Sequence, residues 1–202
     1  MRKKQIVFLT LPFLFASAAL AGPEKYNIDK SHTHIVFLVN HLEFSNTIGR
    51  ITDYDGYFTF DPKEPEKSEI DVTLKSASVA TDVPDLDKEL RGDKFLNTEK
   101  FPTMHFKSTK ITVTDKQKGD VEGELTMLGV TKPVTMQVVY NKSGINPYSN
   151  NYESGFSADI KLKRSDFGMN AYLPAVGDEV RVHLEVEGIN PFKHPGNAKT
   201  PN

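Results

Sequence analysis

The stretch VRVHLEVE, residues 180–187, decides the fold. Apolar and polar residues alternate along it, so an extended chain places each kind on its own face. The stretch FSADIKLK, residues 156–163, repeats this alternation. Both patterns predict antiparallel strands that bury one face and expose the other.

Shorter alternating runs continue along the rest of the chain, separated by Gly, Asp, Asn and Pro. Gly129 lies between two of these runs, where a tight hairpin is expected, and residues 144–151 are predicted to form another loop. About eight strands with one apolar face close into a barrel or stack as a sandwich, because an open sheet would leave that face in water. The periodicity leaves both architectures open. The apolar members of the shorter runs are Ile35, Phe37 and Val39; Phe58 and Phe60; Ile70, Val72 and Leu74; Leu125 and Met127; and Val134, Met136 and Val138.

One segment, residues 85–97, lacks this alternation. It follows Pro84, starts with an Asp of the kind that caps helices, and spaces Leu86 and Leu90 four residues apart before Gly92. This pattern predicts a short helix or two turns within an otherwise all-β chain.

The N-terminus has the three parts of a secretory signal peptide. Residues 2–4 are positively charged, residues 6–14 are almost wholly apolar, and Ala19-Leu20-Ala21 offers a cleavage site before Gly22. We therefore expect a protein exported to the periplasm that does not span a membrane. The expected organisation is a signal peptide over residues 1–21, one domain over 22–190 and a flexible tail over 191–202.

The composition removes several classes of function. The chain has no Cys, which excludes disulfides, thiol nucleophiles and Cys-ligated metals. Acids outnumber Lys and Arg, 27 to 25, and the predicted leader holds three of the bases, so nucleic-acid binding is not expected. The local signatures of acyl and phosphoryl transfer are missing. The sequence thus predicts a protein that is not an enzyme, with no catalytic residue and no catalytic cofactor.

Three histidines near the start of the domain are candidate metal ligands or ligand contacts. His32 and His34 would project from the same face of a strand, but no third ligand is evident in the sequence. We expect the pair to face solvent and to bind no metal. His41 follows Ile35, Phe37 and Val39 on the apolar side, where it is either a buried polar group or a contact for a ligand head group.

Several exact strings resemble the YceI family of bacterial exported proteins, and the match covers nearly the whole mature chain in the expected order. These strings are SHTHIVFLVNH (31–41), DYDGYFTFDP (53–62), NTEKFPTMHFKS (97–108), GELTMLGVTKPV (123–134), KRSDFGM (163–169) and GDEVRVHLEVEG (177–188).

The resemblance implies an eight-stranded antiparallel barrel of lipocalin-like type that holds a polyisoprenoid or similar long amphiphile. Family members often carry an Arg-Asp-x-His-Leu-Arg run in the helical segment, whereas residues 86–91 here read LDKELR. Of the groups that would meet a head group, only Asp87 and Arg91 carry over, which implies a different or uncharged head group.

These expectations together predict a periplasmic carrier for a long-chain amphiphile such as an isoprenoid quinone or a polyprenyl lipid. Two alternatives remain: an enzyme acting on an isoprenoid in the same cavity, and an envelope stress or interaction protein without a ligand. Homodimer formation is also left open. The predicted ligand-binding residues are Phe37, Val39, His41, Phe58, Phe60, Leu74, Asp87, Arg91, Phe95, Phe106, Leu125, Met127, Met136, Phe156, Ile160 and Phe167.

Overall fold

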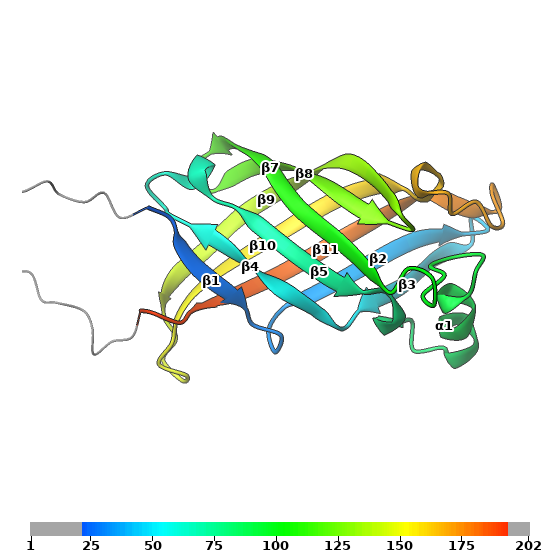
Figure 1. Ribbon diagram of the computed structural model, residues 1–202, viewed down its shortest axis with the longest axis horizontal. Helices are drawn as coiled ribbons and strands as arrows, with labels where there is room; N and C mark the ends of the chain where they lie inside the picture. Colours follow the sequence, from blue (N-terminus) through cyan, green and yellow to red (C-terminus); the bar gives the residue numbers. More distant parts are fainter. Residues whose placement is uncertain (1–21, 194–202) are drawn as a thin grey trace, which may run out of the picture.

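A closed ring of eight antiparallel strands forms an elongated barrel (Figure 1). The computed structural model describes residues 22–193, so the predicted signal peptide and most of the predicted tail lie outside the described residues. The strands of the ring are β1 (Glu24–Ile28), β4 (Tyr54–Phe60), β5 (Ile70–Lys75), β7 (Thr103–Asp115), β8 (Lys118–Met127), β9 (Val130–Ile145), β10 (Tyr152–Lys163) and β11 (Val176–Asn190).

Strand pairing follows that order around the ring and closes between β1 and β11, where Ile28 pairs with Gly188. The closure confirms the predicted eight-stranded antiparallel barrel and rules out the sandwich. Along the β1–β11 seam, ring closure also removes the unpaired edges that an open sheet would present.

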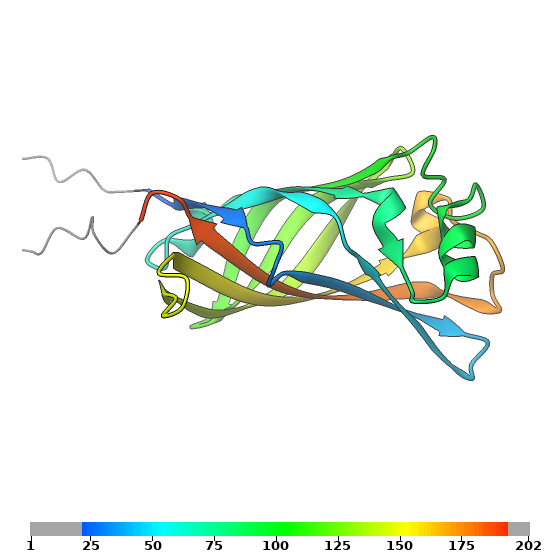
Figure 2. The same ribbon diagram turned by 90° about the horizontal axis from the view of Figure 1, so that it is seen from below.

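Three further strands extend the wall beyond the ring: β2 (His34–His41), β3 (Ser45–Ile51) and β6 (Val79–Ala80). β2 continues along β11 beyond β1, β3 pairs with β2, and β6 pairs with β3 through only two residue pairs. The β2–β3 hairpin therefore projects away from the barrel body, as Figure 2 shows.

The two ends of the barrel carry different elements (Figure 1). The end that we call the α1 end carries the helix α1 (Pro84–Arg91), the β2–β3 hairpin and the β8–β9 turn. The opposite end, here the terminal end, carries the first and last described residues, the short 3-10 turn η1 (Pro65–Lys67) and the β7–β8 turn.

The predicted inward rows are confirmed, because the alternate apolar residues of each run line the barrel interior. The hairpin at Gly129 is also confirmed: Leu128 and Gly129 both have positive φ, 54° and 74°, which suits a two-residue turn between strands. The β9–β10 loop starts two residues later than predicted, because Gly144 and Ile145 still pair with β10.

The segment predicted as a short helix or two turns overlaps α1, which spans Pro84–Arg91 and is followed by a turn over residues 93–96. The predicted capping role of Asp85 is wrong. Val83 occupies the cap position without a side-chain hydrogen bond, and Pro84 starts the helix, as its fixed φ allows. No helix within residues 22–193 combines the length and apolar character needed to cross a membrane.

Candidate functional site

An elongated cavity of about 580 Å³ occupies the barrel interior, and every strand of the ring contributes side chains to its wall. It extends from Leu86 and Tyr172 at the α1 end to Pro62 and Pro65 at the terminal end. This volume lies within the range of small-molecule binding sites, roughly 300–1,000 Å³.

The middle of the wall is almost wholly apolar, with side chains such as Val72, Leu125, Met136, Ile160 and Leu184. The acidic, basic and imidazole side chains of the lining belong to segments at the two ends. They are His41, Glu89 and Arg164 at the α1 end, and Asp115, Lys116 and Lys118 at the terminal end. The centre is therefore suited to an apolar chain, and polar groups of a ligand would be met only at the ends.

Packed aromatic rings lie at the terminal end of the cavity. The ring of Tyr26 stacks on Phe58 with centroids 5.1 Å apart, and Phe156 meets Phe58 and Phe60 edge-on at 5.3 and 5.0 Å. Gly188 makes room for them, since an added Cβ would lie 2.4 Å from the Phe58 ring. The close packing narrows this end of the barrel with rigid side chains.

Aliphatic and aromatic side chains from α1 and its neighbours cover the other end. Leu86 and Leu90, spaced one helical turn apart, both line the cavity, together with Phe95 from the following turn. Tyr172 approaches Phe95 with ring centroids 6.0 Å apart and donates a hydrogen bond of 2.8 Å to Glu89.

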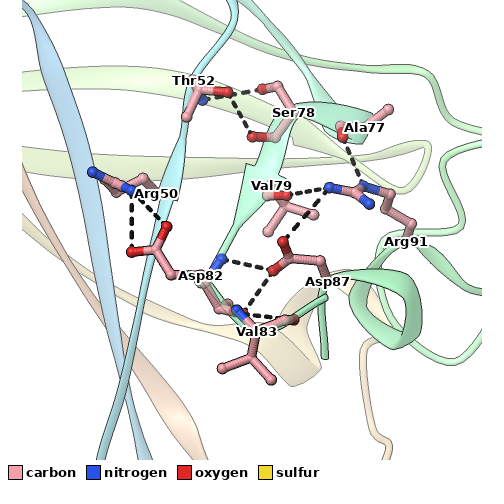
Figure 3. A network of polar contacts seen from close by, with 10 residues as sticks. Arg50, Thr52, Ala77, Ser78, Val79, Asp82, Val83, Asp87 and Arg91 are labelled. Atoms are coloured by element: carbon pink, nitrogen blue, oxygen red, sulfur yellow. Dashed lines mark hydrogen bonds and ion pairs between the residues drawn. The ribbon is translucent and has the colours of Figure 1, made fainter. Parts of the chain in front are cut away.

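The helix is tied to the segment that precedes it through Asp87 and Arg91 (Figure 3). Arg91 donates hydrogen bonds to the backbone carbonyls of Ala77 at 2.8 Å and Val79 at 2.7 Å. Asp87 accepts hydrogen bonds from the backbone N–H and the hydroxyl of Thr81, both at 2.6 Å. These hydrogen bonds hold the pKa of Asp87 below its ordinary value against the partial burial that would raise it.

Asp87 and Arg91 therefore differ from the expectation. Neither lines the cavity. Their polar atoms are directed to the backbone of residues 77–81, so they position the helix at the end of the barrel.

The loop between β10 and β11 is organised by one buried cation. Arg164 is 2% exposed and donates to the carbonyls of Gly177, Met169, Ala171 and Val176 at 2.8–2.9 Å. Four carbonyl acceptors satisfy most of its five N–H donors, which allows a guanidinium to be buried beside an apolar cavity.

Phe167 lies in the 3-10 turn η3 (Arg164–Phe167) and is 3% exposed. It packs in the hydrophobic cluster with Ile35, Tyr54 and Val79 and does not line the cavity. The reason is that the chain turns after β10, so the strand alternation does not continue to residue 167.

All other predicted ligand-binding residues line the cavity. His41 does so from the end of β2, where its side chain is largely exposed, so its reading as a buried polar group is wrong. Whether these residues contact a ligand stays a prediction. The lining residues from the predicted list are Phe37, Val39, His41, Phe58, Phe60, Leu74, Phe95, Phe106, Leu125, Met127, Met136, Phe156 and Ile160.

Some lining residues were not predicted. Leu86 and Leu90 had a visible signal in their helical spacing, but nothing in the sequence showed that this helix face would meet the barrel interior. Tyr172 and the β7–β8 turn had no such signal, because irregular segments reach the cavity only through the tertiary fold.

The His32/His34 prediction rested on both residues lying in one strand. The structure places His32 in the turn before β2 and His34 at the first position of that strand. His32 Nδ1 lies 2.7 Å from the carboxylate of Asp29, whereas His34 is exposed. The two imidazoles therefore do not form a strand pair.

Known proteins resemble the chain in sequence and in fold. A family model described as the YceI-like domain matches residues 26–188. The protein YceI of Escherichia coli O157:H7 is 38% identical over 189 residues, which span 93% of this chain and 98% of that protein.

Two solved structures share the fold. The YCEI protein of Campylobacter jejuni is 33% identical, with a TM-score of 0.68 over 74% of this chain and 88% of that chain. A polyisoprenoid binding domain from Saccharophagus degradans has a TM-score of 0.60 at 13% identity, over 82% of this chain and 98% of that chain.

Proposed function

The chain belongs to the YceI family, and on that premise we propose that it is a periplasmic carrier that holds a long-chain amphiphile inside its barrel. An isoprenoid quinone or a polyprenyl lipid is the ligand class. The observation that carries the proposal is the elongated apolar cavity that runs between the two ends of the barrel.

The chemistry of the wall suits such a ligand. Each CH₂-sized group moved from water into an apolar site contributes about 0.8 kcal/mol, and a long chain offers many of them. The apolar middle of the cavity would select for length and apolarity, because it offers few polar atoms for detailed recognition. The fold shared with the Saccharophagus degradans domain, which is described as polyisoprenoid binding, supports an isoprenoid chain.

The α1 end is the proposed entrance. β6 forms the free edge of the sheet there and pairs only with β3, through two residue pairs. α1 is held against this edge by the side chains of Arg91 and Asp87. A cover attached by a few side-chain hydrogen bonds can open without breaking the strand ladder of the barrel.

A binding role without catalysis fits the distribution of polar groups. The charged lining residues belong to the two ends, far from the middle where a bound chain would be enclosed. Export follows from the predicted leader, so the lipid would be carried through an aqueous compartment.

The test replaces Met136, which lines the cavity and is 9% exposed, with Trp. In an open cavity the larger ring takes up ligand volume, so Met136→Trp should lower the co-purified lipid severalfold while the lipid-free protein stays folded. Lipid is extracted from protein recovered from the periplasmic fraction, where we expect a mature N-terminus at Gly22, and is quantified by mass spectrometry. Thermal unfolding of the delipidated protein is measured in parallel.

Gln137→Trp is the matched control, because Gln137 is the next residue of β9 and is exposed on the outer face. It should keep the wild-type lipid load. A Met136→Trp protein that unfolds easily yet retains the normal load would show that Met136 is packed core. Wild-type protein that carries no lipid would contradict the carrier function itself.

A further inference from the structure

The turn between β1 and β2 brings three metal-ligating side chains together on the outside of the barrel. Asp29 and His32 belong to the turn, and Glu187 lies on β11. One ligand atom from each side chain lies within 4.8 Å of the other two. An imidazole with two carboxylates is a ligand set that first-row divalent ions such as Zn²⁺ accept.

Backbone hydrogen bonds fix these side chains relative to one another. The Asp29 N–H donates to the Glu187 carbonyl at 2.8 Å. The Thr33 hydroxyl accepts from the Glu187 N–H at 3.1 Å and donates to the Glu187 carbonyl at 3.2 Å. Because Thr33 is 4% exposed, this clamp is shielded from water. The turn is therefore held on β11 before any ion arrives.

The charges at this point are unbalanced. Asp29 Oδ2 contacts His32 Nδ1 at 2.7 Å, and the Asp29 side chain is only 13% exposed. The Glu187 carboxylate has no hydrogen bond or ion pair with any residue from 22 to 193. The carboxylates of Glu187 and Glu153 both add to the negative potential at His32. One imidazole among three carboxylates is a setting that a divalent cation complements.

We propose that Asp29, His32 and Glu187 bind a divalent transition-metal ion of the Zn²⁺ type on the outer wall of the barrel. Bonds of about 2.0–2.2 Å bring tetrahedral ligands closer together than 4.8 Å, and the side chains of His32 and Glu187 close this gap by rotation. Water completes the coordination. The ion joins the β1–β2 turn to β11 and stabilises the folded state by mass action.

The proposed site differs from the expectation, drawn from the sequence, that His32 binds no metal. That expectation looked for a third ligand near the His-x-His pair, whereas Glu187 lies far along the chain. His34 is not a member of the group.

The experiment titrates the mature protein with Zn²⁺ by calorimetry and with Co²⁺ by visible absorption, which reports direct coordination. We expect one ion per chain and a higher melting temperature with Zn²⁺. Glu187→Gln should weaken binding at least about tenfold and remove the thermal shift. Because that carboxylate has no partner among the described residues, this variant should fold as the wild type does without metal.

His32→Gln should weaken binding similarly, and His34→Gln, the matched control at an exposed neighbouring imidazole, should bind as the wild type does. The proposal is overturned if the wild-type protein binds no ion. It is equally overturned if Glu187→Gln binds as tightly as the wild type, or if His34→Gln loses as much affinity as His32→Gln.

Discussion

The two ends of the barrel are closed by different kinds of interaction. At the terminal end, Tyr26, Phe58 and Phe60 are each less than 10% exposed and pack ring against ring inside the closed strand ladder. At the α1 end, a helix with no fully buried residue lies beside the free edge of β6, with Leu90 against the core and Arg91 hydrogen-bonded to the backbone before it.

This difference assigns the stability of the folded protein to one end of the barrel and ligand access to the cavity to the other end. Packed rings cannot leave their positions without creating a cavity, whereas a helix held by partly exposed hydrogen bonds opens locally at low cost. The terminal end should therefore determine the free energy of unfolding, and the α1 end should determine how fast a ligand exchanges.

The largest effect is expected for Tyr26→Ala. Tyr26 is 2% exposed, stacks on Phe58 and is not part of the cavity lining, so its removal leaves a void in packed protein. We expect a loss of about 3–5 kcal/mol in the free energy of unfolding, measured by urea denaturation. A loss below about 1 kcal/mol would mean that the rings do not determine the stability of this end.

A smaller change in stability, but a larger change in exchange rate, is expected for Arg91→Ala. The substitution removes the hydrogen bonds to Ala77 and Val79, and the Arg91 side chain is 40% exposed, so about 1 kcal/mol of stability should be lost. The release of a bound fluorescent apolar probe, followed by stopped-flow, should become severalfold faster. Lys88→Ala, which removes an exposed cation from the same helix, is the control. Equal release rates in the two variants would show that Arg91 does not hold the cover closed.

The smallest effect is expected for Asp178→Asn, near the start of β11 and next to the loop between β10 and β11, and it appears in how the melting temperature depends on pH. Burial would raise the pKa of Asp178, but hydrogen bonds from the Ser165 N–H and hydroxyl and the charge of Arg164 outweigh it, so the pKa is lowered. A carboxylate with a lowered folded-state pKa stabilises the protein above its ordinary value of 3.8, and this contribution is lost as pH falls through the lowered pKa. The difference in melting temperature between wild type and Asp178→Asn should therefore shrink between about pH 6 and pH 3. A difference that stays constant over this range would show that the ionisation of Asp178 does not change the stability of the folded protein.

The barrel wall followed from local sequence. Residues 156–163 and 180–187 alternate strictly, and a strand with period two leaves only one way to bury its apolar side. The hairpin at Gly129 was likewise predictable, because its turn needs positive φ, which glycine adopts without strain.

The cavity lining was predictable mainly where it belongs to strands; Phe95, in the turn after α1, is the predicted lining residue outside them. Phe167 is predicted to line the cavity, but the chain leaves the strand at Arg164 and Phe167 packs in the core instead. Asp87 and Arg91 were assigned to ligand binding, whereas the fold brings the backbone of residues 77–81 within their reach. Polar side chains form hydrogen bonds with the backbone groups that the fold brings close to them. Sequence patterns do not show which segment that will be.

The sequence by itself determined that this protein is an all-β chain with one apolar face and a short helical segment, because periodicity and turn chemistry act within a few residues. Only the tertiary structure decided that the apolar face encloses an elongated cavity, that α1 covers one end of it, and that Glu187 meets Asp29 and His32. These features depend on contacts between residues far apart along the chain, and such contacts are set by ring closure and packing, which local patterns do not encode.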